Sequence, residues 1–386
     1  MTPRLYRTTR PLADRVTLAL RRLGVDRIGT PTTVALIALY VAGLILLDGR
    51  QTQTRVALFL PGRAHDALNR LLRVMPLSTR ALLGASVAWV KRHGHEDGYL
   101  CIDDCVIEKA FAKKLPWAGW TYSFAKKRKV YGLHVVVLLW CTSDGELRIP
   151  VAFRLWRPKR SCAPHLYRTK LRLAEVMLKE VLGRGLRCRY IVFDTHYTAG
   201  WFTKMVSRLG LVWVGTLHPR TIVFWGAKRS RRCSVGELAK VVSLKWRKHL
   251  GVRAVSVSVY APKYGRLRLV VTRNRHSNHE YIVTNDSGMD LTTVVLRKVS
   301  RWQVETLFRD TKQYAGLEAC QCRVDQAMVR HVGLVLLTFV VLQMMRRTRE
   351  ESVGKVKERW QLDAMRDGQP PPTPLKACPP HLRATA

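Results

Sequence analysis

Acidic residues are scarce in this sequence. The chain of 386 residues has 27 Asp and Glu against 67 Lys and Arg, which leaves a formal net charge of +40 at pH 7. A charge of this size destabilises a compact fold through self-repulsion unless a polyanion lies close. We therefore expect nucleic acid as the partner, with an anionic membrane as the competing interpretation.

The sequence also lacks an apolar run of the roughly 18 to 20 residues that a membrane-spanning helix needs. The two strongest runs cover residues 33–47 and 332–345, and we interpret both as buried helices of a globular core. The first residues lack the apolar segment and small-residue cleavage site of a secretion signal. We expect a cytoplasmic protein that contacts no membrane.

The order of predicted elements indicates an α/β protein with additions. Residues 1–95 read as a small basic helical domain, and residues 96–217 as a strand, an antiparallel hairpin and then alternating helices and strands. Alternating polar and apolar positions predict a mainly β insertion over residues 218–290, and helices return over 291–350. The last segment, 351–386, ends in a tail too rich in proline to pack.

Carboxylates at the ends of predicted strands are the first candidates for chemistry. Asp103 and Asp104 end the strand predicted over residues 99–104, and Asp194 ends a later one. Ligands collect at the carboxyl ends of parallel strands, where the terminal residues of neighbouring strands lie close together. Such carboxylates repel one another unless a cation lies between them, and Mg²⁺ or Mn²⁺ suits these oxygen ligands. Either position alone could equally cap a turn or a helix.

A third carboxylate, Glu305, lies among basic residues on a predicted helix. Helical spacing places Arg301, Arg309 and Lys312 within about 40° of it around the helix axis. One interpretation is a lattice of ion pairs, Arg301 with Glu305 and Glu305 with Arg309. The other is a carboxylate that binds a metal ion beside cations that hold phosphates.

This stretch resembles the C-terminal signature of the DDE transposases of bacterial insertion sequences. That signature is Tyr, two residues, Arg, three residues, Glu, six residues, Lys. Arg301, Glu305 and Lys312 match it at the right spacing, while Lys298 stands at the tyrosine position. The resemblance favours the metal-binding interpretation for Glu305 and the ion-pair lattice for Arg309.

Two further motifs are similar to those of the same family. Residues 193–197, FDTHY, resemble its second motif, Asp, any residue, Gly, Tyr, with His196 in place of the glycine. The first motif, Asp, any residue, Ser or Thr, corresponds to Asp103, Asp104 and Cys105. This match favours Asp103 as the first ligand and leaves Asp104 as the alternative.

The resemblance covers residues 99–347 and implies a ribonuclease H-like core, a mixed sheet flanked by helices. It implies that Asp103, Asp194 and Glu305 are catalytic and bind Mg²⁺ or Mn²⁺. The enzyme would hydrolyse double-stranded DNA at transposon ends and join the freed 3′-hydroxyl to target DNA. The alternatives are a catalytically silent DNA-binding regulator and a nuclease without strand transfer.

The same resemblance implies partners and a location. The N-terminal helical domain would bind the transposon ends, and two protomers would pair two ends as a homodimer. We expect the protein at the bacterial nucleoid.

Basic residues supply candidate contacts to the DNA backbone. Arg301 and Lys312 would hold phosphates beside the carboxylates. Two basic loops would neutralise further phosphates, although a solvated run of charge is the alternative interpretation for each. The residues of these loops are Lys126, Lys127, Arg128, Lys129, Arg157, Lys159 and Arg160.

Aromatic residues also lie in the lysine-rich loop predicted over residues 113–129. They are Trp117, Trp120, Tyr122 and Phe124. Such side chains can stack on bases. We prefer core packing for them.

Overall fold

The computed structural model describes residues 3–48, 52–58, 64–93, 97–110, 112, 115, 117–123, 126–275 and 278–366. The chain forms two compact units, which we describe separately. The first contains residues 1–89, 106–133 and 308–386, and the second contains residues 90–105 and 134–307. Four elements contribute residues to both units: α5 (Thr79–Arg92), β1 (Tyr99–Glu108), β3 (Arg128–Cys141) and α10 (Trp302–Tyr314).

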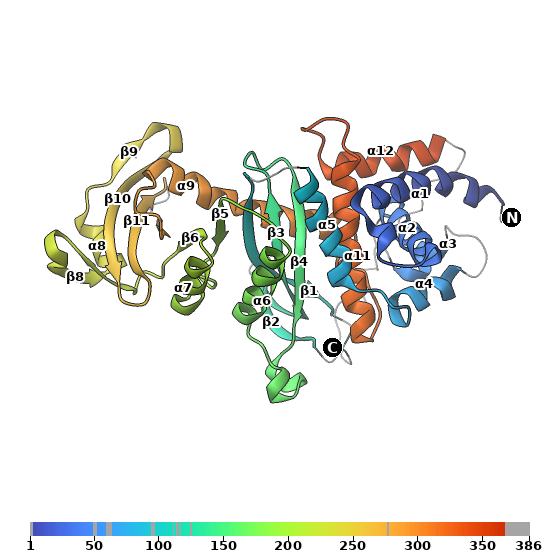
Figure 1. Ribbon diagram of the computed structural model, residues 1–386, viewed down its shortest axis with the longest axis horizontal. Helices are drawn as coiled ribbons and strands as arrows, with labels where there is room; N and C mark the ends of the chain where they lie inside the picture. Colours follow the sequence, from blue (N-terminus) through green and yellow to red (C-terminus); the bar gives the residue numbers. More distant parts are fainter. Residues whose placement is uncertain are drawn as a thin grey trace, which may run out of the picture. The chain divides into compact units, whose positions relative to one another are not determined.

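The first unit is built around α11 (Asp325–Met344), which Figure 1 labels. This helix is longer than the apolar run in the sequence and could cross a membrane by length and composition, but 89% of its apolar window is buried inside the protein. α2 (Pro31–Leu46) packs against it. Both apolar runs are therefore buried helices, as predicted from the sequence.

The local sequence determines where α2 begins, and a buried hydrogen bond joins α2 to α11. Thr30 caps the helix by accepting a hydrogen bond from the backbone N–H of Thr33 at 3.2 Å, and Pro31 takes the first turn, where its missing N–H is harmless. Tyr40 Oη lies 2.8 Å from His331 Nδ1, so a buried hydrogen bond joins the two helices.

The other helices of the first unit surround this pair. α1 and α4 contact α11, and α12 contacts α1, α2 and α11. The helical segment predicted over residues 1–95 therefore shares its hydrophobic core with helices from the C-terminal part of the chain. The proline-rich tail predicted at the C-terminus lies outside the described residues from 367 onward. The bounds are α1 (Pro3–Leu23), α3 (Gln53–Leu58), α4 (Ala64–Arg73), α5 (Thr79–Arg92) and α12 (Val353–Arg366).

The second unit contains the α/β core predicted from the sequence. Its strands follow the order β4-β3-β1-β5-β6, with β1, β5 and β6 parallel and β3 antiparallel to β4. This order and these directions are those of a mixed ribonuclease H-like sheet, so the predicted fold class is confirmed. The bounds are β4 (Arg148–Trp156), β5 (Tyr190–Phe193) and β6 (Val212–Thr216).

Helices cover this sheet. α6 contacts β4, α7 contacts β6, and α9 contacts β5 and β6. α6 starts at Lys170 because Thr169 is its N-cap and accepts a hydrogen bond from the N–H of Arg172 at 3.2 Å. The bounds are α6 (Lys170–Gly183), α7 (Gly200–Arg208) and α9 (Leu291–Ser300).

The predicted β insertion extends the core sheet instead of forming a separate one. β12 pairs antiparallel with β6, and the order continues β12-β11-β10-β7-β8, with β9 also on β10. The insertion returns the chain to α9, which leads into α10. The bounds are β7 (Ile222–Trp225), β8 (Arg231–Ser234), α8 (Val235–Val241), β9 (Lys245–Arg247), β10 (Val252–Ala261), β11 (Gly265–Arg273) and β12 (His279–Thr284).

Two sequence-based boundaries were wrong. β1 runs to Glu108, so Asp103 and Asp104 lie inside the strand and do not end it. The apolar pair Val106 and Ile107 continues the strand pattern past the aspartates, and Ile107 is fully buried. The lysine-rich loop contains a strand, β2 (Gly119–Ser123), which pairs antiparallel with the start of β3.

Candidate active site

Asp103 and Asp194 lie side by side at one edge of the parallel strands. β1 and β5 are in register, with Ile102 opposite Phe193, so the next residues along the two strands are these aspartates. Adjacent strands are about 4.8 Å apart, which brings the carboxyl groups close together. Burial and the neighbouring Asp194 carboxylate raise the pKa of Asp103 to about 7.

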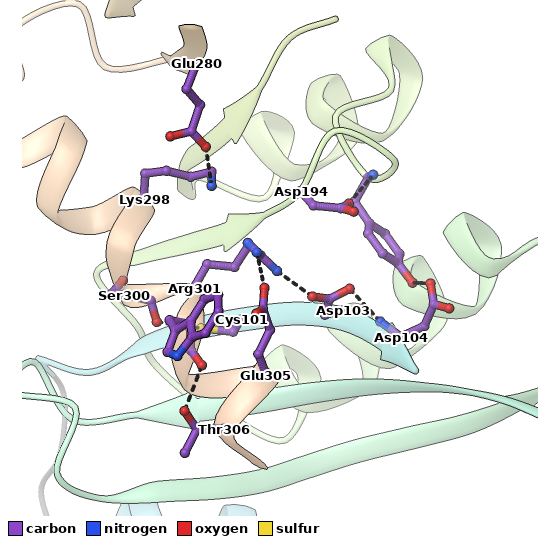
Figure 2. A network of polar contacts seen from close by, with 12 residues as sticks. Cys101, Asp103, Asp104, Asp194, Glu280, Lys298, Ser300, Arg301, Glu305 and Thr306 are labelled. Carbon is purple, nitrogen blue, oxygen red and sulfur yellow. Dashed lines mark hydrogen bonds and ion pairs between the residues drawn. The ribbon is translucent and has the colours of Figure 1, made fainter. Parts of the chain in front are cut away.

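Arg301 connects Asp103 to Glu305, as Figure 2 shows. Its Nη1 lies 2.5 Å from Asp103 Oδ2, and its Nη2 donates to Glu305 Oε1. The Asp103 side chain is only 14% exposed and that of Arg301 15%. Despite burial, the negative charges of Asp103 and Glu305 raise the pKa of Arg301 above its usual value. One guanidinium therefore brings the first and third predicted carboxylates together.

The end of α9 places this arginine over β1. Ser300 accepts at its backbone carbonyl from Tyr99 Oη at 3.4 Å and from Cys101 Sγ at 3.8 Å. Tyr99, Cys101 and Asp103 alternate along β1 and share one face of the strand. The residue after Ser300, Arg301, is thereby positioned beside Asp103.

Asp104 belongs to a different cluster. Its Oδ2 accepts a hydrogen bond from Lys170 Nζ at 2.6 Å and lies 3.3 Å from His134 Nδ1, while its Oδ1 accepts from Tyr197 Oη at 3.1 Å. Burial alone would raise the pKa of Asp104, but the contacts to His134 and Lys170 outweigh it and lower the pKa to about 2. This carboxylate is already fully partnered within the protein.

Tyr197 links the two aspartate clusters. Its backbone N–H donates to Asp194 Oδ1 at 3.2 Å, while its phenol donates to Asp104. The Tyr197 side chain is fully buried. Asp104 therefore orients the turn that carries Asp194 without itself facing Arg301.

More than half of the chain matches a known protein family. The model of the DDE superfamily endonucleases matches residues 25–233, which is more than half of the chain. The chain belongs to the DDE superfamily of endonucleases. No curated protein matches the chain.

The matched range of this DDE endonuclease includes Asp103, Asp104 and Asp194 and ends before Glu305. The assignment of Glu305 as the third carboxylate therefore depends on its spacing in the sequence and on its contact with Arg301.

The carboxylates of this DDE endonuclease have the donor chemistry of a divalent-cation site. Burial and the like charge of the neighbouring Asp194 both raise the pKa of Asp103, and a cation between the two carboxylates would relieve their repulsion. Within the described ranges, no three His, Cys, Asp or Glu side chains are grouped to hold a metal ion. The guanidinium of Arg301 lies between Asp103 and Glu305 instead. The residues fit Mg²⁺ or Mn²⁺ chemically, provided that Arg301 moves aside.

Several predicted phosphate-binding residues contact protein groups. Lys312 donates to the backbone carbonyl of Val106 at 2.6 Å and pairs with Glu318 at 3.0 Å. Lys126 and Arg128 both pair with Glu108. The remaining predicted residues of the basic loops are exposed: Lys127, Lys129, Arg157, Lys159 and Arg160.

One predicted ion pair was wrong. Arg309 pairs with its neighbour Asp310 at 3.1 Å instead of with Glu305. Asp310 is buried, so its carboxylate needs a cation, and it lies one residue from the arginine. The other half of the predicted lattice, Arg301 with Glu305, is present.

Sequence reasoning missed the residues that surround Asp104. His134 is the single histidine in the apolar stretch of β3, and Lys170 is the first residue of α6. A polar residue within a buried strand was the available signal for His134. Lys170 carried no such signal, since a lysine in the first turn of a surface helix is ordinary.

Proposed function

We propose that this DDE endonuclease is a transposase that cleaves DNA at transposon ends and joins the 3′-hydroxyl ends to target DNA. The observation that carries the proposal is the juxtaposition of Asp103 with Asp194 and, through Arg301, with Glu305. These are the three acidic residues that the sequence motifs select. A fully partnered Asp104 supports Asp103 as the first catalytic carboxylate.

Asp103, Asp194 and Glu305 would hold Mg²⁺, or Mn²⁺ in its place. Bound divalent cations supply an activated water oxygen and neutralise the charge on the scissile phosphate. Asp194 is held in place by the Tyr197 backbone N–H, and the Thr198 hydroxyl donates to the Asp194 carbonyl at 2.7 Å. This preorganisation keeps the carboxylate aimed at the site as the reaction proceeds.

Arg301 would have two roles in this proposal. Before a cation binds, its guanidinium pairs with both Asp103 and Glu305 and offsets one of their two negative charges. With bound cations as the counter-charge of these carboxylates, the guanidinium would be free to bind a DNA phosphate in a bidentate manner. Lys312 and the basic loops would add contacts to the DNA backbone.

The proposal extends to the organisation of the protein. The N-terminal helices would bind transposon ends, and two copies would pair two double-stranded ends as a homodimer. The protein would act on the nucleoid in the bacterial cytoplasm. Its large positive charge supports association with DNA.

Cleavage of duplex DNA that carries the inverted repeats flanking the coding region tests the proposal. We expect nicking that requires Mg²⁺ or Mn²⁺ and is lost in Asp103→Ala, Asp194→Ala and Glu305→Ala. Glu358→Ala, which removes an exposed carboxylate on α12, should cut normally. Binding without cutting by the purified protein would instead identify a silent regulator.

Strand transfer needs a second measurement. A supercoiled target plasmid is added to the cleavage reaction, and joined products are sought at the 3′ ends of the cut DNA. Cutting without joining would identify a nuclease that lacks strand transfer.

A further inference from the structure

The β2–β3 ribbon of the first unit presents one aromatic face. Trp120 lies opposite Tyr131 and Tyr122 lies opposite Lys129 in the antiparallel register. Side chains directly opposite one another in such a pair project from the same side, and residues two apart along a strand do so too. The four side chains Trp120, Tyr122, Lys129 and Tyr131 therefore form one surface, which we call the ribbon face.

The opposite side of the ribbon packs against the protein. Thr121 lies opposite Val130, and Val130 is only 2% exposed. The ribbon is thus anchored by one side and leaves the ribbon face outward.

Two of the three aromatic side chains of the ribbon face are largely exposed. Trp120 is 73% exposed and Tyr122 is 48% exposed. The ring of Trp120 meets that of Tyr131 edge to face, with centroids 5.7 Å apart. Core packing, which we expect from the sequence for the aromatic residues of this segment, holds for Trp117 but not for Trp120 and Tyr122. Phe124 lies outside the described residues. Large aromatic surfaces left in water at one place are typical of a binding site.

The basic residues near the ribbon face favour a polyanion as its ligand. Lys126 and Arg128 both pair with Glu108, whose single negative charge offsets one of their two positive charges. Lys127 and Lys129 form no ion pair within the part of the chain that the structure describes, and both are exposed. Lys127 also has φ +50°, a left-handed conformation in which glycine is favoured. A lysine is present at this turn in spite of that strain, so its charge is the simplest reason for it.

We propose that the ribbon face is a stacking platform for unpaired bases of DNA. The proposal rests on the proposed function in that DNA is the substrate. Bases expose their flat faces to aromatic side chains only when they are unstacked, whereas an intact duplex offers mainly its backbone. Lys127 and Lys129 would then contact the phosphates of the same strand. A second copy of the chain is a poor occupant of this face, because without DNA between them the exposed Lys127 and Lys129 of the two copies would repel each other.

Binding of single-stranded and duplex DNA to the full-length protein tests the platform. All proteins carry Asp194→Ala, so that no DNA is cut. Fluorescence anisotropy with labelled oligothymidine should show that Trp120→Ala combined with Tyr122→Ala weakens binding about tenfold or more. Affinity for a duplex of the same length should change by no more than about twofold, since duplex binding depends mainly on backbone charge.

Matched variants keep the test specific. Trp246→Ala removes another exposed tryptophan, 51% exposed on β9, and should leave single-strand affinity unchanged. Trp120→Phe keeps an aromatic ring and should retain most of the affinity. Circular dichroism establishes that each variant is folded.

Two results would overturn the platform: equal loss of affinity for both DNA forms, or no loss for either. A dimer of the parent protein that Trp120→Ala dissociates would also overturn it, in favour of a protein interface. The proposed function fails separately, if the wild-type protein does not cut transposon ends while the single-strand effect persists.

Discussion

Arg301 Nη1 lies 2.5 Å from Asp103 Oδ2, and the other terminal nitrogen of the same guanidinium contacts Glu305. These contacts make the arginine the counter-charge of the candidate active site. A positively charged side chain among carboxylates competes with a divalent cation for the same negative charge. The arginine should therefore influence both the stability of the fold and its response to metal.

Arg301→Gln should destabilise the protein by about 3 kcal/mol without divalent cations, because removal of one partner leaves buried carboxylates uncompensated. Mn²⁺ should recover more stability in this variant than in the wild type, since the cation would supply the missing charge. Urea unfolding with and without Mn²⁺ measures both effects. Lys179→Gln, which breaks a pair at a 54% exposed lysine on α6 and leaves Glu175 paired with Arg172, should cost less than about 1 kcal/mol. Equal losses in the two variants would contradict this account.

Asp104 should stabilise the fold in a pH-dependent way. Its pKa of about 2 in the fold lies below the value of 3.8 for an isolated side chain. The ionised form is therefore favoured by folding, and its contribution is present above about pH 4 and is lost as the pH falls toward 2. The difference in pKa corresponds to about 2 kcal/mol.

The variant Asp104→Asn tests this contribution. It should be less stable than the wild type by about 2 kcal/mol at neutral pH, and the difference should shrink between about pH 4 and pH 2. Urea midpoints across this range provide the measurement. Asp14→Asn, at an exposed position of α1, should track the wild type throughout. A difference that stays constant with pH would argue against the electrostatic origin.

Tyr197→Phe should show whether Tyr197 positions Asp194 for catalysis in addition to stabilising the fold. The change removes the phenol hydrogen bond to Asp104 and keeps the backbone hydrogen bond to Asp194. We expect a loss of about 1 to 2 kcal/mol in stability, and a lower kcat for DNA cleavage with an unchanged KM. Tyr40→Phe, which removes a buried hydrogen bond to His331 in the first unit, should lose stability and keep kcat. If both variants lose only stability, Tyr197 is a structural residue alone.

Unpaired lysines on the ribbon should matter more for DNA binding than paired ones. Lys127→Ala combined with Lys129→Ala should weaken duplex binding and lower the slope of log affinity against log salt by up to about 1.8, or about 0.9 for each phosphate that a lysine no longer neutralises. Lys126→Ala combined with Arg128→Ala removes the same formal charge, yet both side chains are paired with Glu108 and should contribute less. Titrations at several salt concentrations decide between the pairs. The reverse order would show that the ion pairs open on DNA.

Much of the core could be predicted from the sequence. The strand preceding Asp194, the antiparallel hairpin of β3 and β4, and the alternation of helices and strands after it were predicted and are present. These elements carry strong local signals: β-branched runs, a turn with Gly145 at φ +73°, and apolar positions at helical spacing. The spacing of Arg301 and Glu305 likewise predicted their ion pair.

Other features had no local signal. Residues 99–102 of β1 are all buried, so the pattern does not reveal which face carries the chemistry, and hence whether Asp103 or Asp104 faces Arg301. The helices of the N-terminal segment read as a separate domain because nothing in their own sequence indicates that α11 and α12 complete their core. Lys170 meets Asp104 only because α6 packs beside β4.

By itself the sequence determined the class of fold, the acidic and basic residues available for chemistry and the net charge that demands a polyanion, since these depend on composition and on local periodicity. The motif resemblance favoured Asp103 and left Asp104 as the alternative, and tertiary structure decided which of these two aspartates lies beside Asp194 and Arg301. The reason is that neighbouring residues of a strand point to opposite faces, and only the packing of α6 and α9 on the sheet gives each face its partners.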